Sequence, residues 1–434
     1  MSNQRLEKIT AHLAGSGANV SGLDSNPTGA QDTKFGHVGK KSDSDVVIVS
    51  ALRTPIARAK KGLFKNTTPD DLLKAVLEAT LQRTKIDPSL IEDVVVGNVQ
   101  TVGAYSMPAR TAMFRAGIPY TASVRSVNRQ CSSGLQAVAS IASEINSGFI
   151  EVGIGSGVES MTNGGAPGDP SSLPPMNLSE IFSDPMAASA LTPMGETSEN
   201  VAMRYGITRE QQDSMAVESH RRALAAQKAG LFNDEIVPVT TIFEDKDGNE
   251  KEITVTQDEG PREGTSMEGL AKLKPAFKKN GTTTAGNASQ VSDGAAAVLL
   301  MSRKKAQELG LPVIGVFRGF KVQGVKPDEM GIGPAAAIPA LLQDTDLSIG
   351  DIDIYEINEA FASQATYCVQ KLGIPMEKVN PLGGAIALGH PLACTGARQI
   401  GTLLHQLRRT KKKLGVVSMC IGTGMGAAGL FEAE

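Results

Sequence analysis

The sequence has no tryptophan, only four cysteines and only five histidines among 434 residues, and these shortages exclude several kinds of protein. The cysteines stand far apart, at Cys131, Cys368, Cys394 and Cys420, and no two of them form a CxxC pair. Neither a disulfide framework nor a zinc site with closely spaced ligands fits this pattern. We therefore expect free thiols in a reducing compartment.

An excess of charge and a long apolar run are missing as well. The formal net charge is −3 and the isoelectric point is near 6.1, so a basic field that would hold a nucleic-acid backbone is absent. No apolar stretch reaches the ~18 residues that a membrane-spanning helix needs. We expect a soluble protein that does not bind nucleic acid.

What the sequence contains is typical of an α/β protein. Hydrophobic residues make up 41% and charged residues 21%. Runs of β-branched residues at 46–49 and 94–96 predict buried strands, and between them Leu72, Leu73, Val76 and Leu77 follow helical spacing. Strand and helix therefore alternate, as in α/β folds.

The same order of elements occurs twice. Residues 314–317 resemble the first strand, 351–358 resemble 93–98, and Val379-Asn380, a helix and 415–419 repeat the order of Val127-Asn128, a helix and 151–155. Two similar α/β halves follow from this. We predict a flexible leader at 1–44, a first half at 45–165 plus 284–312, an inserted domain at 166–283 and a second half at 313–434.

The predicted insert has a composition of its own. It begins with a segment rich in Gly, Pro and Ser at 166–185, followed by predicted helices near 196–205 and 208–229 and a hairpin that turns at Asp247-Gly248. Its end is basic, with Arg262, Lys272, Lys274, Lys278 and Lys279. This basic run is either a solvated face or a landing site for a polyanionic ligand.

Cys131 stands directly before a predicted helix whose apolar residues lie at 135, 138, 141, 142 and 145. Free backbone N–H groups and the positive end of the helix dipole favour a thiolate at such a position. The small residues Ser132, Ser133 and Gly134 leave room for a substrate. The alternative is a buried structural cysteine.

Three further segments have the features of ligand-facing turns. His390 lies between Gly389 and Pro391 at the predicted start of a helix, where it is either a base or a structural histidine. Cys420 ends a strand and precedes a glycine-rich turn, and Asn358 also follows a strand. Open α/β sheets bind ligands at the carboxyl ends of their strands, where these turns lie. Two thiols, an imidazole and an amide can together carry out acyl transfer.

Five motifs from about residue 45 to 431 strongly resemble the thiolase family: NRQCSSGLQA, GNASQVSDGAA, NEAFA, GGAIALGHPLACTGAR and CIGTGMG. The resemblance implies a duplicated five-layer αβαβα fold with an inserted loop domain, assembled as a homodimer or tetramer. It also implies that coenzyme A is a substrate and that no further cofactor is needed.

The resemblance carries roles over to single residues. Cys131 matches the nucleophile that forms the acyl-enzyme, His390 the base that activates it, and Cys420 the acid and base that exchanges the α-proton. Asn358, through a water, and His390 match one oxyanion hole. The backbone amides of Cys131 and Gly422 match the other.

Further residues match the substrate site. Ser289 matches a contact with the pantetheine arm of coenzyme A, and Arg262 matches a contact with its nucleotide. Met194, Met330 and Phe361 match positions that line the pocket.

The direction of the reaction follows from two details of the resemblance. Short-chain biosynthetic members carry His-Met-Gly where this chain has Pro193-Met194-Gly195, and their nucleophile motif differs from the one around Cys131. Both details resemble the degradative, broad-chain branch, which cleaves 3-ketoacyl-CoA in fatty-acid β-oxidation. The alternatives are acetoacetyl-CoA condensation and a silent acyl-CoA or lipid-binding protein; a papain-like protease is disfavoured by the duplicated α/β pattern.

The amino-terminal residues contain a targeting pattern. Arg5, Leu6, Ile9, His12 and Leu13 share one face of a short predicted helix. The string Arg5-Leu6-x5-His12-Leu13 resembles the amino-terminal peroxisomal signal, which an import receptor reads, although a frayed amphipathic tail is the alternative. With the thiolase motifs, this pattern favours a peroxisomal location.

Overall fold

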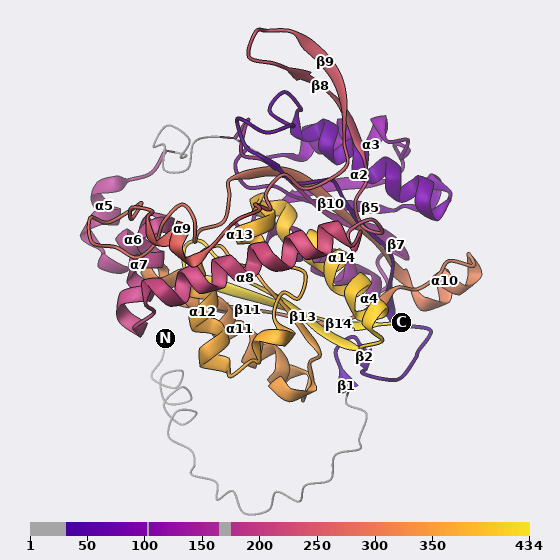
Figure 1. The fold of residues 1–434 in the computed structure, drawn as a ribbon. Helices are drawn as coiled ribbons and strands as arrows, with labels where there is room; N and C mark the ends of the chain where they lie inside the picture. The colour runs from indigo at the N-terminus through magenta and orange to yellow at the C-terminus, as the bar shows by residue number, and fades with distance from the viewer. Residues whose placement is uncertain (1–31, 102–103, 165–174) are drawn as a thin grey trace, which may run out of the picture. The chain divides into compact units, whose positions relative to one another are not determined.

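The computed structural model describes residues 32–101, 104–164 and 175–434 (Figure 1). The strands are β1 (Asp32–Thr33), β2 (Gly36–His37), β3 (Val46–Arg53), β4 (Ala57–Arg58), β5 (Asp93–Gly97), β6 (Ser123–Val127), β7 (Val152–Ser160), β8 (Val239–Glu244), β9 (Glu250–Val255), β10 (Ser292–Ser302), β11 (Gly315–Gly324), β12 (Ile354–Ile357), β13 (Leu414–Ile421) and β14 (Met425–Ala433). The α-helices are α2 (Pro69–Thr84), α3 (Ser106–Arg115), α4 (Ser133–Asn146), α5 (Leu178–Ser183), α6 (Pro185–Ser189), α7 (Met194–Tyr205), α8 (Arg209–Lys228), α9 (Met267–Ala271), α10 (Arg303–Glu308), α11 (Gly333–Asp344), α12 (Ala362–Leu372), α13 (Ala385–Leu388) and α14 (Leu392–Thr410). Short 3-10 helices are η1 (Pro88–Leu90), η3 (Pro327–Ile332), η4 (Ile349–Asp351) and η5 (Met376–Lys378).

The main sheet consists of two halves with the same strand order. In the first half-sheet β3 pairs with β10, β10 with β7, β7 with β5 and β5 with β6; in the second, β11 pairs with β14, β14 with β13 and β13 with β12. A parallel bridge from Tyr355 to Val379 takes the place of β6 in the second half. In both halves the first two pairings are antiparallel and the next is parallel. The predicted duplication is confirmed.

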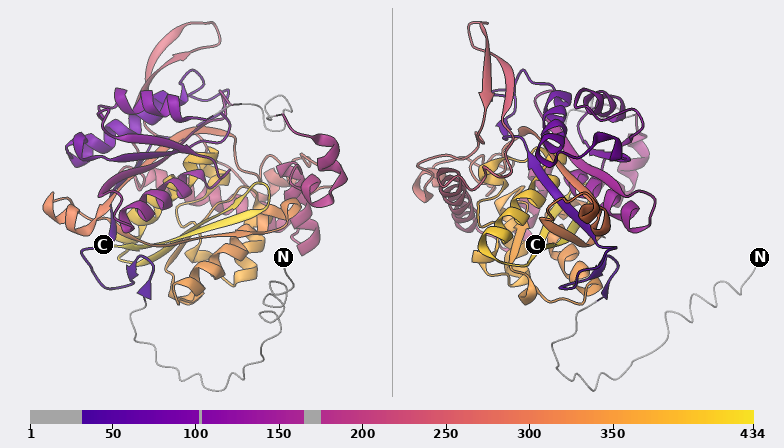
Figure 2. Two further views of the ribbon diagram at one scale, coloured as in Figure 1. Left: turned by 180° about the vertical axis from the view of Figure 1, so that it is seen from behind. Right: turned by 90° about the vertical axis from the view of Figure 1, so that its right-hand side faces the viewer.

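Three apolar clusters separate five layers of helix and sheet. One cluster lies where α2 and α3 cover the first half-sheet, around Leu73, and another where α11 covers the second, around Leu341. The central cluster surrounds α4 and α14 between the two half-sheets, where Val138 and Leu403 are fully buried. Figure 2 shows the indigo helices of the first half and the orange helices of the second on opposite sides. The predicted α/β fold with five layers is therefore observed.

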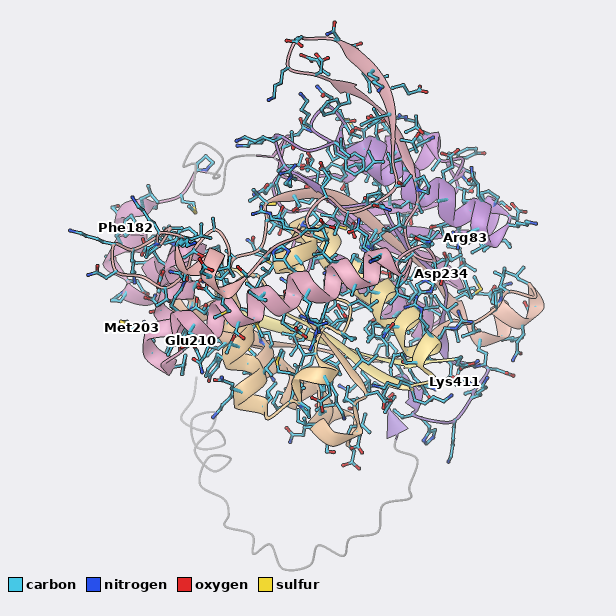
Figure 3. All side chains as sticks on the ribbon, in the orientation of Figure 1. Arg83, Phe182, Met203, Glu210, Asp234 and Lys411 are labelled. Carbon is cyan, nitrogen blue, oxygen red and sulfur yellow. The ribbon has the colours of Figure 1, made fainter. Side chains whose placement is uncertain are left out.

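The described part of the predicted insert contains α5 to α9 and the hairpin β8–β9, which projects from the body in Figure 1. The helix α8 begins with the capping box that the sequence predicts, in which Thr208 and Gln211 bond each other's backbone N–H. This helix contacts α12 and α13 of the second half. Glu210, labelled in Figure 3, lies near its start, and Asp234 follows its end.

The amino-terminal boundary differs from the prediction. The predicted flexible leader covers 1–44, but β1 and β2 already form a hairpin within it, and the ring of Phe35 packs edge-on against Phe317 with centroids 4.8 Å apart. The backbone N–H of Gly39 also donates to the carboxylate of Glu432. A few tertiary contacts hold this segment, so the hydrophobic periodicity of its sequence does not reveal that it is ordered. The predicted targeting residues Arg5, Leu6, His12 and Leu13 lie outside the described residues.

In the part of the chain that the structure describes, no helix is long and apolar enough to cross a membrane.

Candidate active site

A strained turn places Cys131 at the start of α4. Gln130 has a φ of 47°, a left-handed conformation that costs free energy for a residue other than glycine. The turn is held because the hydroxyl of Ser133 donates to the carbonyl oxygen of Gln130 at 2.6 Å and accepts the N–H of Arg129 at 2.9 Å. Cys131 is half-buried and its thiol is free. The predicted position at a helix terminus is thus observed.

Glycines allow the amino termini of α4 and α14 to pack against each other. A Cβ on Gly134 would lie 2.3 Å from the carbonyl oxygen of Ala393 in α14, and a Cβ on Gly157 of β7 would lie 2.0 Å from the same atom. A Cβ on Gly396 would lie 2.5 Å from the backbone nitrogen of Leu135. Only glycine fits at these contacts. The close packing brings together the turns before the two helices, which hold Cys131 and His390.

His390 occupies the turn before α14. Its Nε2 lies 3.3 Å from Nδ2 of Asn358, and its Nδ1 lies 2.6 Å from Oγ1 of Thr395. The ring is buried, and burial together with the positive charge of Arg398 lowers the pKa of His390 to about 3. The imidazole is therefore neutral at neutral pH and able to accept a proton.

Asn358 follows β12 and is fully buried. Its backbone N–H donates to the carbonyl oxygen of Ser418 in β13 at 2.9 Å, and its own carbonyl oxygen accepts from Nε2 of Gln364 at 2.7 Å. The side-chain oxygen Oδ1 has no hydrogen-bond partner among the described residues. A buried amide oxygen in this state is an available acceptor beside His390.

The end of β13 brings the thiol of Cys420 near Cys131, and the turn that follows brings Gly422 there. Burial raises the pKa of the Cys131 thiol to about 11, although the N–H groups of Gly422 and of Cys131 itself act to lower it. Burial also raises the pKa of Cys420 well above its ordinary value, and the neighbouring Cys131 adds to this. The N–H groups thus favour the thiolate as expected, but desolvation outweighs them.

The pocket residues that the sequence predicts gather around Cys420. Met330 and Ala360 form an apolar cluster with Cys420, and Phe361 packs against it. A Cβ on Gly422 would lie 3.8 Å from the sulfur of Met194, so this methionine borders the same turn.

The two residues matched to coenzyme A, Ser289 and Arg262, lie on two segments that hydrogen bonds join to each other and to this cluster. The N–H of Ser289 donates to the carbonyl oxygen of Ala360 at 3.0 Å, and Nε2 of the next residue, Gln290, donates to the carbonyl oxygen of Gly260 at 3.0 Å. Arg262 lies two residues after Gly260 and is exposed.

Among the described residues, no group of three His, Cys, Asp or Glu side chains lies together as metal ligands would.

Sequence reasoning missed three residues of the site. Thr395 holds His390, Gln130 carries the strain of the nucleophile turn, and Phe277 packs edge-on against Phe361 with centroids 6.1 Å apart. Phe277 lies within the basic run, whose lysines indicated an exposed segment and not a pocket. The spacing of five residues from His390 to Thr395 was the only available signal for the threonine.

Comparison with known proteins identifies one family. The family models described as Thiolase, N-terminal domain and Thiolase, C-terminal domain match residues 46–304 and 311–433. The chain is 58% identical over 429 residues to 3-ketoacyl-CoA thiolase A, peroxisomal, of Mus musculus, covering 99% of each chain. It is 55% identical to 3-ketoacyl-CoA thiolase, peroxisomal, of Homo sapiens, again covering 99% of each.

Solved structures give the same result. The dimeric peroxisomal thiolase of Saccharomyces cerevisiae superposes with a TM-score of 0.85 at 49% identity, covering 91% of this chain and 99% of that one. A second structure, of the peroxisomal 3-ketoacyl-CoA thiolase of Saccharomyces cerevisiae, is described as five-layered and built from two core domains of identical topology, with a TM-score of 0.75 and 44% identity over 92% of this chain and 100% of that one. The chain belongs to the thiolase family.

Proposed function

We propose that this chain cleaves 3-ketoacyl-CoA with coenzyme A, giving acetyl-CoA and an acyl-CoA two carbons shorter, in the β-oxidation of fatty acids. The observation that carries the proposal is a neutral His390, with Nε2 3.3 Å from Nδ2 of Asn358, in a site where Cys131 before α4 lies near the thiol of Cys420 at the end of β13. The relatives above are named for 3-ketoacyl-CoA. The degradative direction agrees with Pro193, where biosynthetic members of the family carry histidine.

The first half of the reaction forms the acyl-enzyme. Nε2 of His390 takes the thiol proton of Cys131, and the sulfur attacks the 3-keto carbon of the substrate. The bond between the second and third carbons then breaks, its electron pair passes to the departing acetyl-CoA enolate, and the thiol of Cys420 protonates that carbon. Because both thiols are neutral at rest, each proton is present where the step needs it.

Preorganised donors stabilise the charge that develops on oxygen. The N–H groups of Cys131 and Gly422, which already face the Cys131 sulfur, serve the oxygen of the acyl-cysteine. Asn358, whose Oδ1 is free to hold a water, and His390 serve the thioester oxygen. In the second half of the reaction the Cys420 thiolate takes the thiol proton of coenzyme A, the coenzyme A sulfur attacks the acyl-cysteine carbon, and the Cys131 sulfur leaves and regains the proton held by His390.

The substrate follows the stretch from Phe361 to Arg262. Ser289 serves the pantetheine arm near Ala360, and the exposed Arg262 and its basic neighbours serve the phosphates. The pocket residues Met194, Met330 and Phe361 receive the acyl chain. This assignment gives the basic run a ligand.

Location and assembly extend the proposal. The relatives from Mus musculus and Homo sapiens carry the word peroxisomal in their names, and we assign this chain to the peroxisome, with import through Arg5, Leu6, His12 and Leu13. We also assign a homodimer. In support, β6 is an edge strand of the sheet, and such an edge can pair with a second copy.

The test is the loss of 3-ketoacyl-CoA enolate absorbance on addition of coenzyme A, with substrates of four, eight and sixteen acyl carbons. We expect rapid loss with the longer substrates and none in Cys131→Ala. Activity on the shortest substrate alone would assign the chain to acetoacetyl-CoA instead. No activity on any substrate would leave a binding protein on the same fold.

Cys420→Ala separates the two thiols. This variant should still accept an acyl group from a simple acyl-CoA, because Cys131 and His390 remain, but it should lose carbon–carbon cleavage. Undiminished cleavage in Cys420→Ala would remove Cys420 from the mechanism.

A further inference from the structure

A buried hydroxyl holds the imidazole of His390 on the side away from Asn358. Nδ1 of His390 lies 2.6 Å from Oγ1 of Thr395, in the first turn of α14, and this Oγ1 lies 3.2 Å from the carbonyl oxygen of Pro391. Thr395 is fully buried and His390 is 4% exposed, so water does not compete for these bonds. A hydroxyl can accept one hydrogen bond and donate its single hydrogen.

The count of donors and acceptors decides which nitrogen carries the hydrogen. If Nδ1–H donates to Thr395, the hydroxyl donates to Pro391 and the lone pair of Nε2 accepts from Nδ2 of Asn358. Oδ1 of Asn358 is then an acceptor without a partner among the described residues. The opposite tautomer needs the amide of Asn358 turned round, which strands a buried NH2 group instead. Orphaned donors are rarer than orphaned acceptors.

We propose that Thr395 is a positioning residue that fixes the tautomer of His390, with the hydrogen on Nδ1 and the lone pair on Nε2. The inference rests on the proposed role of His390 as the base for Cys131. The lone pair then lies on the nitrogen beside Asn358, where the thiol proton must arrive. When His390 has taken that proton, its Nδ1–H keeps the same bond to Thr395, so no side chain has to turn during the step.

A hydroxyl suits this base better than a carboxylate would. A carboxylate beside Nδ1 would raise the pKa of the imidazole and favour a protonated ring at rest. The hydroxyl of Thr395 is neutral, and burial together with Arg398 keeps the pKa of His390 at about 3. The ring is therefore oriented without being charged.

The test compares three variants on one helix. Thr395→Val removes the hydroxyl and keeps the shape, and Thr395→Ser keeps the hydroxyl. The matched control is Thr402→Val: Thr402 is also fully buried in α14, but its hydroxyl donates to Glu235 at 3.0 Å and does not contact His390. The chain has five histidines, so nitrogen NMR of histidine-labelled protein can assign the His390 signal by its loss in His390→Asn.

We expect Nδ1–H in the wild type, in Thr395→Ser and in Thr402→Val, and a shift towards Nε2–H in Thr395→Val. In turnover, Thr395→Val should lower kcat by about 10²-fold or more with little change in KM, and Thr395→Ser should restore most of it. If Thr395→Val does not fold, Thr395→Ala is measured in the same way.

An unchanged tautomer in the hydroxyl-free variant would overturn the proposal, whether or not kcat falls, because a loss without a tautomer change indicates a structural role. A kcat equal to that of Thr402→Val would overturn it as well. If the wild type fails to turn over 3-ketoacyl-CoA, the proposed function fails, yet the NMR comparison still tests the tautomer.

Discussion

Replacing Gly157 by alanine should disable the site without touching a reacting group. Gly157 lies in β7, and a Cβ there would be 2.0 Å from the carbonyl oxygen of Ala393 and 2.8 Å from its carbonyl carbon, whereas real Cβ atoms essentially never approach below 3.0 Å. The amino terminus of α14 must therefore move away from β7 by about 1 Å. A misplacement of about this size can cost on the order of 10²-fold in rate.

The movement falls on His390, which stands three residues before Ala393. We expect Gly157→Ala to lower kcat/KM for 3-ketoacyl-CoA cleavage by about 10²-fold, and overpacking to lower the free energy of unfolding by about 1–3 kcal/mol. The control is Gly324→Ala at the end of β11, where no heavy atom lies within 4 Å of an added Cβ. Turnover and urea unfolding are measured on both variants. Gly157→Ala with kcat/KM close to that of the control would refute the reasoning.

Three further predictions follow from buried groups. Because burial raises the pKa of Cys131 to about 11, the ultraviolet thiolate absorbance that Cys131→Ser removes should be missing at neutral pH and grow only in alkali; a thiolate signal at neutral pH would show that the helix terminus outweighs burial. The fold lowers the pKa of His390 from its ordinary value of 6.5 to about 3, so acidification protonates this residue first in the unfolded chain and the free energy of unfolding falls as pH falls below 6.5; between pH 6.5 and 5 the wild type should lose about 1–2 kcal/mol more unfolding free energy than His390→Asn, and equal losses would contradict this. Arg318→Met should lower the free energy of unfolding by about 3–5 kcal/mol, because Glu432 loses its ion pair at 2.8 Å and the buried Asp45 keeps only Arg303, whereas the exposed Arg221→Met should change it little; similar urea midpoints for the two would refute the estimate.

The duplicated fold divides one site between its halves. Cys131 comes from the turn after β6, the edge strand of the first half-sheet, while His390, Cys420 and Asn358 come from the second half. The first half has its own asparagine at the position of Asn358, namely Asn98 after β5, but Nδ2 of Asn98 donates to the backbone oxygen of Val158. The equivalent amide is thus used for structure in one half and is free for chemistry in the other.

The candidate groups of the site could be predicted from the sequence because each lies beside a local pattern of residues. Cys131, His390, Cys420 and Asn358 all lie at turns next to a predicted strand or helix end, and the sheet edge brings such turns together. The repeat of strand order could likewise be read from three matching segments. These features depend on neighbours along the chain.

The parts that the sequence left out depend on neighbours in space. Thr395 matters because α14 directs its hydroxyl at His390, and Phe277 matters because it reaches Phe361 from the insert. Local residues show the N–H groups that favour a thiolate at Cys131, but not the burial by other segments that outweighs them. The leader boundary was misplaced for the same reason, since contacts to Phe317 and Glu432 order the segment from residue 32 onwards.

The most direct test of the central claim is to trap the acyl-enzyme. The protein is mixed with a 3-ketoacyl-CoA of eight acyl carbons without free coenzyme A and quenched in acid, and its mass is then measured intact and after digestion. The account predicts release of acetyl-CoA and a six-carbon acyl group on the peptide that contains Cys131. An unmodified protein, or an acyl group on Cys420 alone, would contradict it.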